Sequence, residues 1–350
     1  MPFILNIFYF VSVLGIIVFI HELGHLLAAK AFGVYCNEFA IGMGPTIFKL
    51  KKPHWETTYS IRLLPLGGFV SMAGEPGEGD MGVPVERTVP GIAPWKRLII
   101  MLAGIAMNFL LAFVIFTGFF TMYGTNDVPL PIVKEVVEGG PADKAGLQAN
   151  DHITKITFFD GGSVEPKHFN DVTLPIMTYG GRELIFEVDR NGETLEFTLT
   201  PQKDGERWVI GIYAQDGVHR SVSFFEALKL SVDEIVYTVS SLAFLLLRLV
   251  RGIGTDAVGG PVQIFKVTSD ISVGGFPYFL ILVASLSINV GVINAIPIPI
   301  FDGGRALLTL IEMVIRRPIP EKLENFVMMI GLAIVAVLFV LIMYKDLFLS

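Results

Sequence analysis

The chain has 350 residues, of which 52% are apolar and only 17% are charged. Soluble domains are usually about 25% charged, so this composition excludes an ordinary soluble protein and predicts a polytopic α-helical membrane protein. Residues 126–222 hold nine Lys or Arg against sixteen Asp or Glu, and this acidic balance argues against nucleic acid as a partner, because such binding depends on neutralising phosphates.

The first apolar segment runs from about residue 2 to residue 32 and carries no charge between Phe3 and Ile20. About 20 apolar residues cross the hydrocarbon of a bilayer, so the segment predicts a membrane-spanning helix. It lacks a basic start and a cleavage site of small residues. We therefore expect it to be retained rather than removed as a signal peptide.

The second half of this span contains the motif His21-Glu22-Leu23-Gly24-His25. Two histidines four positions apart lie on one face of a helix and can bind one metal ion, with the glutamate beside them as general base. A soluble core can hold such a pair without function. In hydrocarbon, however, each polar side chain costs several kcal/mol unless it binds something or lines a cavity. The motif therefore predicts a hydrolytic zinc site inside the membrane.

Residues 33–94 contain no long apolar helix and are rich in Gly and Pro. The stretches 57–64 and 66–72 resemble strands, and they predict β-hairpins that lie at the membrane face or dip into it. Non-helical backbone at that depth must be shielded by protein or line a cavity. We therefore expect these hairpins to be associated with the membrane and to lie close to the site.

A second span is expected from about residue 98 to residue 123, directly after Lys96 and Arg97. Asn108 lies within it. A buried Asn in a span usually joins neighbouring helices through hydrogen bonds, and the other interpretation is a contact in the active site. The sequence leaves both interpretations open.

An acidic insert of about 80 residues follows, from 126 to 202, which is enough for one small core. Strands are expected to begin at 131–133 and to run over 151–156, with a short helix between them. Two segments in which apolar and polar residues alternate flank Asn191-Gly192, a dipeptide typical of a tight hairpin turn. These patterns predict a small α+β domain.

Residues 223–250 are apolar and helical in pattern but carry charges such as Glu226, Lys229 and Asp233. The segment is either a further span or a helix lying in the membrane surface, and the charge spacing favours the surface helix. A Gly-containing break is expected at 252–260. Two more spans are expected at about 276–296 and 325–344.

Basic residues between spans one and two, and between spans three and four, predict that both connections face the cytoplasm. This orientation places the insert and both termini outside, and a further span at 223–250 would put one basic connection on the wrong side. We therefore predict about four spans. The expected parts are an N-terminal membrane half (1–125), the insert (126–202), a linker with the interfacial helix (203–275) and a C-terminal membrane half (276–350).

Catalytic zinc needs three protein ligands, and the first motif supplies two of them. Asp302 is the candidate for the third, because it follows the helix-breaking Pro297 and Pro299 and precedes two glycines that allow a close approach. The alternative is an aspartate that caps the helix after it. Asn294, if it points at the site, could bind the substrate backbone or a developing oxyanion.

These two motifs resemble the site-2 protease family of intramembrane metalloproteases. The first is the HExxH signature at His21 to His25, and Asn294 to Gly304 matches the pattern Asn-x-x-Pro-x-Pro-x-x-Asp-Gly-Gly. The resemblance covers nearly the whole chain. The stretches 39–45 and 62–72 and the insert are similar to the bacterial regulator-of-sigma-factor protease branch, and the insert looks like a single PDZ domain.

The resemblance implies a zinc metalloendopeptidase that cuts within or near transmembrane segments of substrates such as anti-sigma factors or signal-peptide remnants. His21, His25 and Asp302 would bind Zn²⁺, and Glu22 would be the general base. A hairpin would add an edge strand to the unwound substrate helix. One departure is that Gly104 to Asn108 lacks the proline common in relatives. The implied substrate contacts are Asn294, Asn108, Arg62, Gly67, Gly68, Phe69 and Val70.

The resemblance also implies a multi-pass protein of the bacterial cytoplasmic membrane, with its active site toward the cytoplasm and the PDZ-like domain outside. That domain either captures a newly made C-terminus or filters substrates by size, and its acidic balance disfavours capture of a carboxylate. Two other classes are a noncatalytic membrane scaffold and a transporter. The transporter is disfavoured because no repeat of spans is present in the sequence.

Overall fold

The computed structural model describes residues 2–75, 78–79, 81–126, 129–205, 207–215, 217–249, 251–253, 260, 265, 271–317 and 319–348. Most of the expected break at 252–260 and part of the expected linker before residue 275 lie outside these residues. The chain forms two compact units. We call Met1–Phe119, Phe224–Val239 and Gly260–Leu349 the membrane unit, and Phe120–Ser223 with Ser240–Gly259 the insert unit.

Five helices in the described part of the chain are long and apolar enough to cross a membrane, so the protein is a multi-pass membrane protein. The sequence predicted about four spans and assigned 223–250 to the membrane surface. The helix α5 over that segment also meets the criterion of length and composition, because a long apolar run lies between Glu234 and Arg248. The long helices are α1 (Pro2–Ala31), α2 (Pro94–Tyr123), α5 (Phe224–Leu249), α7 (Ile271–Ala295) and α9 (Glu321–Phe348).

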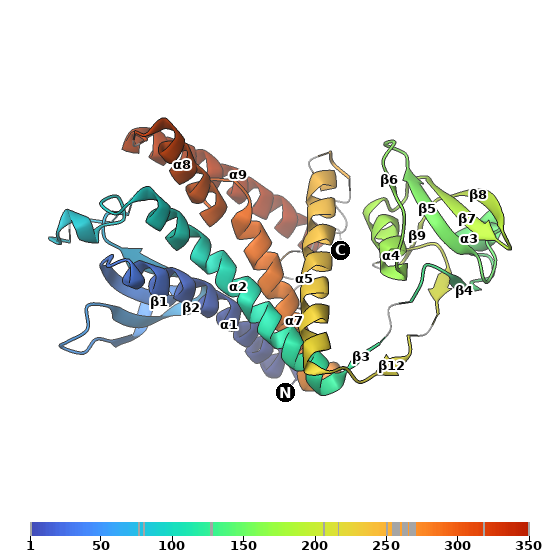
Figure 1. Cartoon of the computed structure of the whole chain (residues 1–350), viewed down its shortest axis with the longest axis horizontal. Helices are drawn as coiled ribbons and strands as arrows, with labels where there is room; N and C mark the ends of the chain where they lie inside the picture. The colour runs from blue at the N-terminus through green and yellow to red at the C-terminus, as the bar shows by residue number, and fades with distance from the viewer. Residues whose placement is uncertain are drawn as a thin grey trace. The chain divides into compact units, whose positions relative to one another are not determined.

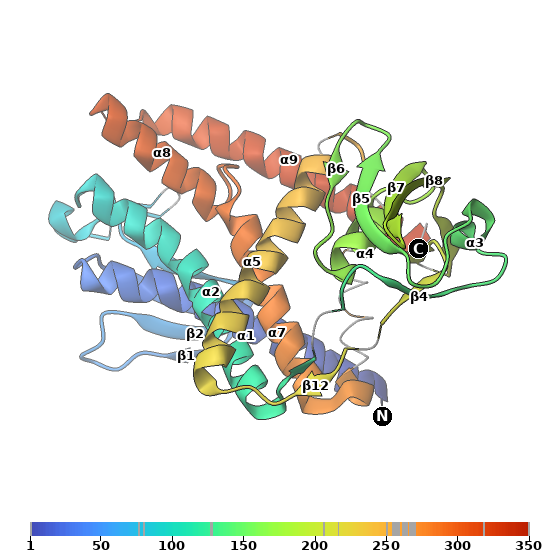
Figure 2. The same cartoon turned by 45° about the vertical axis from the view of Figure 1, so that its right-hand side comes forward.

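Helices α1 and α2 approach each other closely, and both views show them side by side (Figures 1 and 2). A Cβ added to Gly24 would lie 2.4 Å from the carbonyl oxygen of Ala103, so only glycine allows this approach. Nearer the start of α1, on the same side as Gly24, Val13 and Ile17 are fully buried in a cluster with Val283 of α7. These contacts fix α1, which carries the first motif, between two neighbouring helices.

The strands β1 (Cys36–Leu50) and β2 (Thr58–Met72) form a curled antiparallel sheet that packs against α1. Residues 36–41 of β1 pair with 68–72 of β2 on one side, and residues 38–41 pair with 58–61 on the other. The segment 68–72 is therefore an outer strand of this sheet. The expected β-hairpins are present, and the curl arises because β1 is paired along both of its edges.

Arg62 binds within this sheet rather than extending from it. Its Nη2 donates to Glu38 Oε1 at 2.9 Å, Ser60 Oγ donates to the same oxygen, and the guanidinium lies 4.6 Å from the Phe69 ring centre. Burial raises the pKa of Glu38, but the hydrogen bonds from Ser60 and Arg62 outweigh it and hold the pKa below its ordinary value. The ion pair therefore joins neighbouring parts of the curled sheet.

The insert unit has a four-stranded antiparallel sheet in the order β6-β5-β7-β8, and smaller strand pairs β4–β11, β9–β10 and β3–β12. The Asn191-Gly192 turn joins β7 to β8 with positive φ angles of 56° and 88°, which confirms the predicted hairpin. The elements are β3 (Thr125–Asn126), β4 (Val133–Val136), α3 (Pro141–Ala145), β5 (His152–Phe158), β6 (Ser163–Val164), α4 (Phe169–Thr178), β7 (Leu184–Arg190), β8 (Glu193–Leu199), β9 (Gln202–Asp204), β10 (Arg207–Val209), β11 (Ile212–Ala214) and β12 (His219–Arg220).

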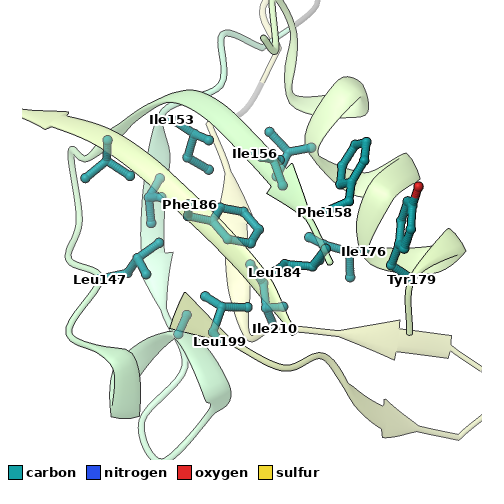
Figure 3. Packing of buried hydrophobic residues seen from close by; sticks show 14 of the residues in the cluster. Leu147, Ile153, Ile156, Phe158, Ile176, Tyr179, Leu184, Phe186, Leu199 and Ile210 are labelled. Carbon is teal, nitrogen blue, oxygen red and sulfur yellow. The ribbon is translucent and has the colours of Figure 1, made fainter. Parts of the chain in front are cut away.

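Alternating residues of the sheet and the inner face of α4 form the core of the insert unit (Figure 3). Phe158 of β5 stacks on Tyr179 with ring centres 4.5 Å apart, and Phe186 of β7 is fully buried. The unit continues beyond the predicted end at residue 202, because β11 pairs with β4 and both Ile210 and Ile253 are buried in the core. The predicted boundary was too early, since strands of two or three residues leave little periodicity in a sequence.

Asp151 is the fully buried carboxylate of this unit, and each of its oxygens has partners. Arg190 donates from Nε at 2.6 Å and from Nη2 at 2.7 Å, and the backbone N–H of Gln148 donates at 2.8 Å. Arg190 also donates to the carbonyl of Gly146. This closed network joins β7 to the loop before β5.

Candidate active site

The two histidines of the first motif lie on one face of α1 and are 8% and 7% exposed. They are separated by one helical turn, and their Nε2 atoms are 3.4 Å apart. Glu22 lies between them in sequence and is half-buried. A Cβ added to Gly68 of β2 would lie 3.0 Å from Glu22 Cγ, so the outer strand of the sheet runs directly past the proposed base.

The Nδ1 atom of His25, which faces away from the other histidine, has a partner that fixes the tautomer of the ring. His25 Nδ1 lies 2.8 Å from the carbonyl oxygen of Ile100, and a carbonyl can only accept. Nδ1 therefore carries the proton, and the neutral ring presents a lone pair at Nε2. This is the arrangement of a metal-binding histidine whose second nitrogen is held by the protein.

Asn108 holds the other histidine in the same way. Asn108 Nδ2 lies 3.2 Å from His21 Nδ1. Asn108 is fully buried, yet its Oδ1 has no hydrogen-bond partner among the described residues. Amide oxygen and nitrogen are assigned from the hydrogen-bond network. Exchanging them lets His21 Nδ1–H donate to Oδ1, which satisfies the buried oxygen and leaves the His21 Nε2 lone pair free.

Asp302 is the first residue of α8 (Asp302–Ile315), and its Oδ2 lies 3.0 Å from His21 Nε2 and 3.2 Å from His25 Nε2. The two glycines after it allow this position. A Cβ at either Gly303 or Gly304 would lie 2.2 Å from the carbonyl oxygen of Ala295 or Ile298 respectively. The turn that contains Pro297 and Pro299 can therefore fold tightly under the start of α8.

Three atoms that can each donate an electron pair to a metal thus meet at one point, 3.0–3.4 Å apart. In the part of the chain that the structure describes, Asp302 Oδ2 has no hydrogen-bond partner, and His21, His25 and Asp302 are the one group of His, Cys, Asp and Glu suited to a metal ion. Such atoms repel one another unless a cation lies between them. Two imidazoles and a carboxylate are a donor set of catalytic zinc with a fourth position open, so these residues fit zinc.

Helix α2 leaves the space that the imidazoles need. A Cβ on Gly104 would lie 2.4 Å from His25 Nε2 and 2.8 Å from His21 Cε1. The sequence drew attention to Asn108 as a polar residue within a span, but to Gly104 only because the stretch lacks a proline. The spacing of four residues places Gly104 and Asn108 on one face of the helix. This spacing was the available signal that both residues lie against the imidazoles.

The other predicted site residues occupy different positions. Asn294 is half-buried in the last turn of α7, and Val70 is 7% exposed in a cluster with Leu26 of α1. Gly67 has a φ angle of 75°, which favours glycine, and precedes Gly68 in β2. The sequence treated Asn108 and Arg62 as substrate contacts, whereas their side chains lie against His21 and Glu38.

The fold and this site define a multi-pass membrane protein with a hydrolytic metal centre, and comparison with known proteins agrees. The model of peptidase family M50 matches residues 9–338. The zinc metalloprotease RasP of Geobacillus kaustophilus is 31% identical over 420 aligned positions, which cover 97% of each chain. The regulator of sigma-W protease RasP of Bacillus subtilis is 29% identical over 98% of each chain. The chain belongs to peptidase family M50, and it is a zinc metalloprotease.

Proposed function

We propose that this protein hydrolyses peptide bonds within or next to the transmembrane segments of other proteins, using His21, Glu22, His25 and Asp302. The observation that carries the proposal is the convergence of three ligand atoms in a buried position, two of them on a membrane-spanning helix. A noncatalytic scaffold would not need such a donor set. A general base beside it favours hydrolysis over transport of ions.

His21, His25 and Asp302 would hold zinc, and when bound it polarises the scissile carbonyl and makes water more acidic. Glu22 accepts the proton of the attacking water and returns it to the leaving amine. Asn108 and the Ile100 carbonyl hold the two imidazoles in their tautomers. Asn294, at the end of α7 and eight residues before Asp302, would bind the substrate backbone or the developing oxyanion.

We propose that the segment 68–72 of β2 receives the substrate as an added strand. A helical peptide bond is sterically hidden, and pairing with an edge strand unwinds and aligns it. The segment is an outer strand of its sheet, and Gly68 lies against Glu22. Phe69 and Val70 belong to the same edge and Gly67 directly precedes it, whereas Arg62 supports it through Glu38.

The relative in Bacillus subtilis is named for regulation of sigma-W. We propose by analogy that membrane-bound anti-sigma factors are one substrate class, and that remnants of signal peptides are another. Both present a single apolar helix, which is the form of substrate that a site within a membrane span can receive. The lipid bilayer is the second partner.

For topology we propose four spans in the bacterial cytoplasmic membrane, with the insert unit outside and the active site toward the cytoplasm. The chain enters α5 from β12, which pairs with β3 in the insert unit. At the other end of α5, Arg248 lies 3.8 Å from Asp160, and Ile253 is buried in the same unit. The first half of α5 belongs to the membrane unit and its second half to the insert unit. The charges at Glu226, Lys229 and Asp233, and the basic connections on either side of the span pattern, favour a surface helix over a fifth span.

We propose that the insert unit is a PDZ-like domain that excludes substrates with bulky outer parts. Its antiparallel sheet and two helices are consistent with such a domain. The alternative is that it binds a new C-terminus. The acidic balance of residues 126–222 favours the filter, because it repels a free carboxylate at low salt.

The central test is Glu22→Gln in full-length protein with a purified single-span peptide as substrate. A neutral amide cannot accept the water's proton, so cleavage should fall by about 10²–10⁴-fold while zinc content stays at one per chain. In cells, membrane peptides that accumulate with Glu22→Gln but not with wild type would identify the substrates. Cleavage near the wild-type rate would rule out Glu22 as the base.

A further inference from the structure

Glu75 follows the end of β2 and is held in place by two contacts. Its Oε2 accepts the backbone N–H of Met72 at 3.3 Å, and its Oε1 accepts from Arg305 Nη1 at 3.1 Å. The Glu75 side chain is only 11% exposed. Nothing in the sequence motifs or in the catalytic mechanism uses this carboxylate.

The Met72 N–H that Glu75 occupies belongs to the outer edge of the sheet. Ala73 donates its own N–H to the carbonyl of Tyr35, which precedes β1. Backbone N–H groups of successive residues in a strand point in opposite directions, so the Met72 N–H points away from β1. The N–H groups of Val70 and Gly68 have the same parity and point to the same outer edge. Glu75 therefore takes the last donor of the row that would pair with an added strand.

Arg305 connects this carboxylate to the metal-binding helix. It lies three residues after Asp302, on the first turn of α8. The next residue, Ala306, is 4% exposed in the same core cluster as Val70 and Met72. The ion pair and this packing hold the end of the β2 edge at a set position relative to Asp302.

We propose that Glu75, held by Arg305, is a register stop that limits substrate pairing to the edge before Met72 and thereby determines which peptide bond is cut. This inference rests on the proposed edge strand and assigns its end point. A substrate strand that slipped by one residue would turn its side chains to the opposite face, so alternative registers differ by two residues. Occupying the Met72 donor removes the pairing that the shifted register would gain.

The test uses full-length protein and a purified single-span peptide that the wild type cuts at one bond, with the products mapped by mass spectrometry. Glu75→Ala frees the Met72 N–H and should yield a second product displaced by two residues, at roughly one-tenth of the main product or more. Glu75→Gln keeps an acceptor for the Met72 N–H but loses the charge. This variant should still cut the substrate mostly at the same bond as the wild type. Glu78→Ala changes an exposed acid nearby and should leave the products unchanged.

Arg305→Met provides a second variant, because it leaves Glu75 without its ion pair and should also give the displaced product. Zinc content is measured for every variant to show that the site is intact. Unchanged products from both Glu75→Ala and Arg305→Met, each loaded with zinc, would overturn the register stop. The proposed function itself would fail separately, through absence of cleavage by the wild type or through normal cleavage by Glu22→Gln.

Discussion

Each of the two units contains an aspartate with a buried carboxylate oxygen, and the two carboxylates have different partners. Asp151 in the insert unit is fully buried and has both oxygens bonded to Arg190, with a backbone N–H as a further donor. Asp302 in the membrane unit faces two imidazole nitrogens, and within the described residues its Oδ2 accepts no hydrogen bond. Protein donors satisfy both oxygens of Asp151, whereas Oδ2 of Asp302 remains available to bind a cation.

This difference separates a structural carboxylate from a functional one by its unsatisfied atoms. Buried polar groups are normally paired, so an unpaired carboxylate beside two imidazole lone pairs requires an explanation. A bound zinc ion provides it. The same reasoning applies to two other buried polar groups of the membrane unit. Asn108 and the Ile100 carbonyl each have an imidazole nitrogen as partner and orient the imidazoles.

The largest effect is expected for Asp302→Ala, which removes one of the three proposed zinc ligands. Zinc should be lost at concentrations that saturate the wild type, and cleavage should be abolished. Because the apolar clusters that hold the helices together stay intact, the zinc-free protein should keep its helical content. Zinc content by mass spectrometry and circular dichroism check both parts. Retention of zinc at wild-type affinity would remove Asp302 from the ligand set.

Gly104→Ala should disturb the same site without touching a ligand. Its new methyl group would lie 2.4 Å from His25 Nε2, so the imidazole must move and zinc affinity should fall by about 10–100-fold. Gly118→Ala on the same helix is the matched control, because no described atom lies within 4 Å of its added Cβ. Chelator competition measures both variants. Equal affinities would mean that α2 shifts freely away from the histidines.

Asp151→Ala should have the opposite profile, with loss of stability and intact zinc. Removing one partner of a buried ion pair leaves Arg190 uncompensated, so the free energy of unfolding of the insert unit should fall by about 3 kcal/mol. Asp204→Ala, at an exposed position of β9, is the control. Hydrogen exchange in the full-length protein should show faster exchange in β5 and β7. Loss of zinc from this variant would contradict the separation of the two roles.

Deleting the insert should have the smallest effect on the chemistry. Asn126 pairs with His219, so a short Gly/Ser bridge between them removes the domain where its ends already meet. The truncated protein should keep zinc and its cleavage rate on trimmed substrates within about a few-fold. It should also cut substrates that retain their outer domains. Continued resistance of those substrates, with zinc present, would favour capture of C-termini over filtering.

The sequence by itself determined the membrane class, the metalloprotease motif and the Asn191-Gly192 hairpin, and it predicted Asp302 as the third ligand. These predictions depend on local periodicity, on motif spacing and on the high cost of polar residues in hydrocarbon. The likeness to peptidase family M50 confirms the class of enzyme.

Only the tertiary structure shows the contacts from which we propose roles for Asn108, Gly104, Arg62 and Glu75. Each depends on a partner far away in the chain: His21 for Asn108, the imidazoles for Gly104, Glu38 for Arg62 and Arg305 for Glu75. The return of β11 to β4, which extends the insert beyond residue 202, has the same cause. Local patterns report which face of an element is apolar, whereas long-range pairing depends on how the elements pack.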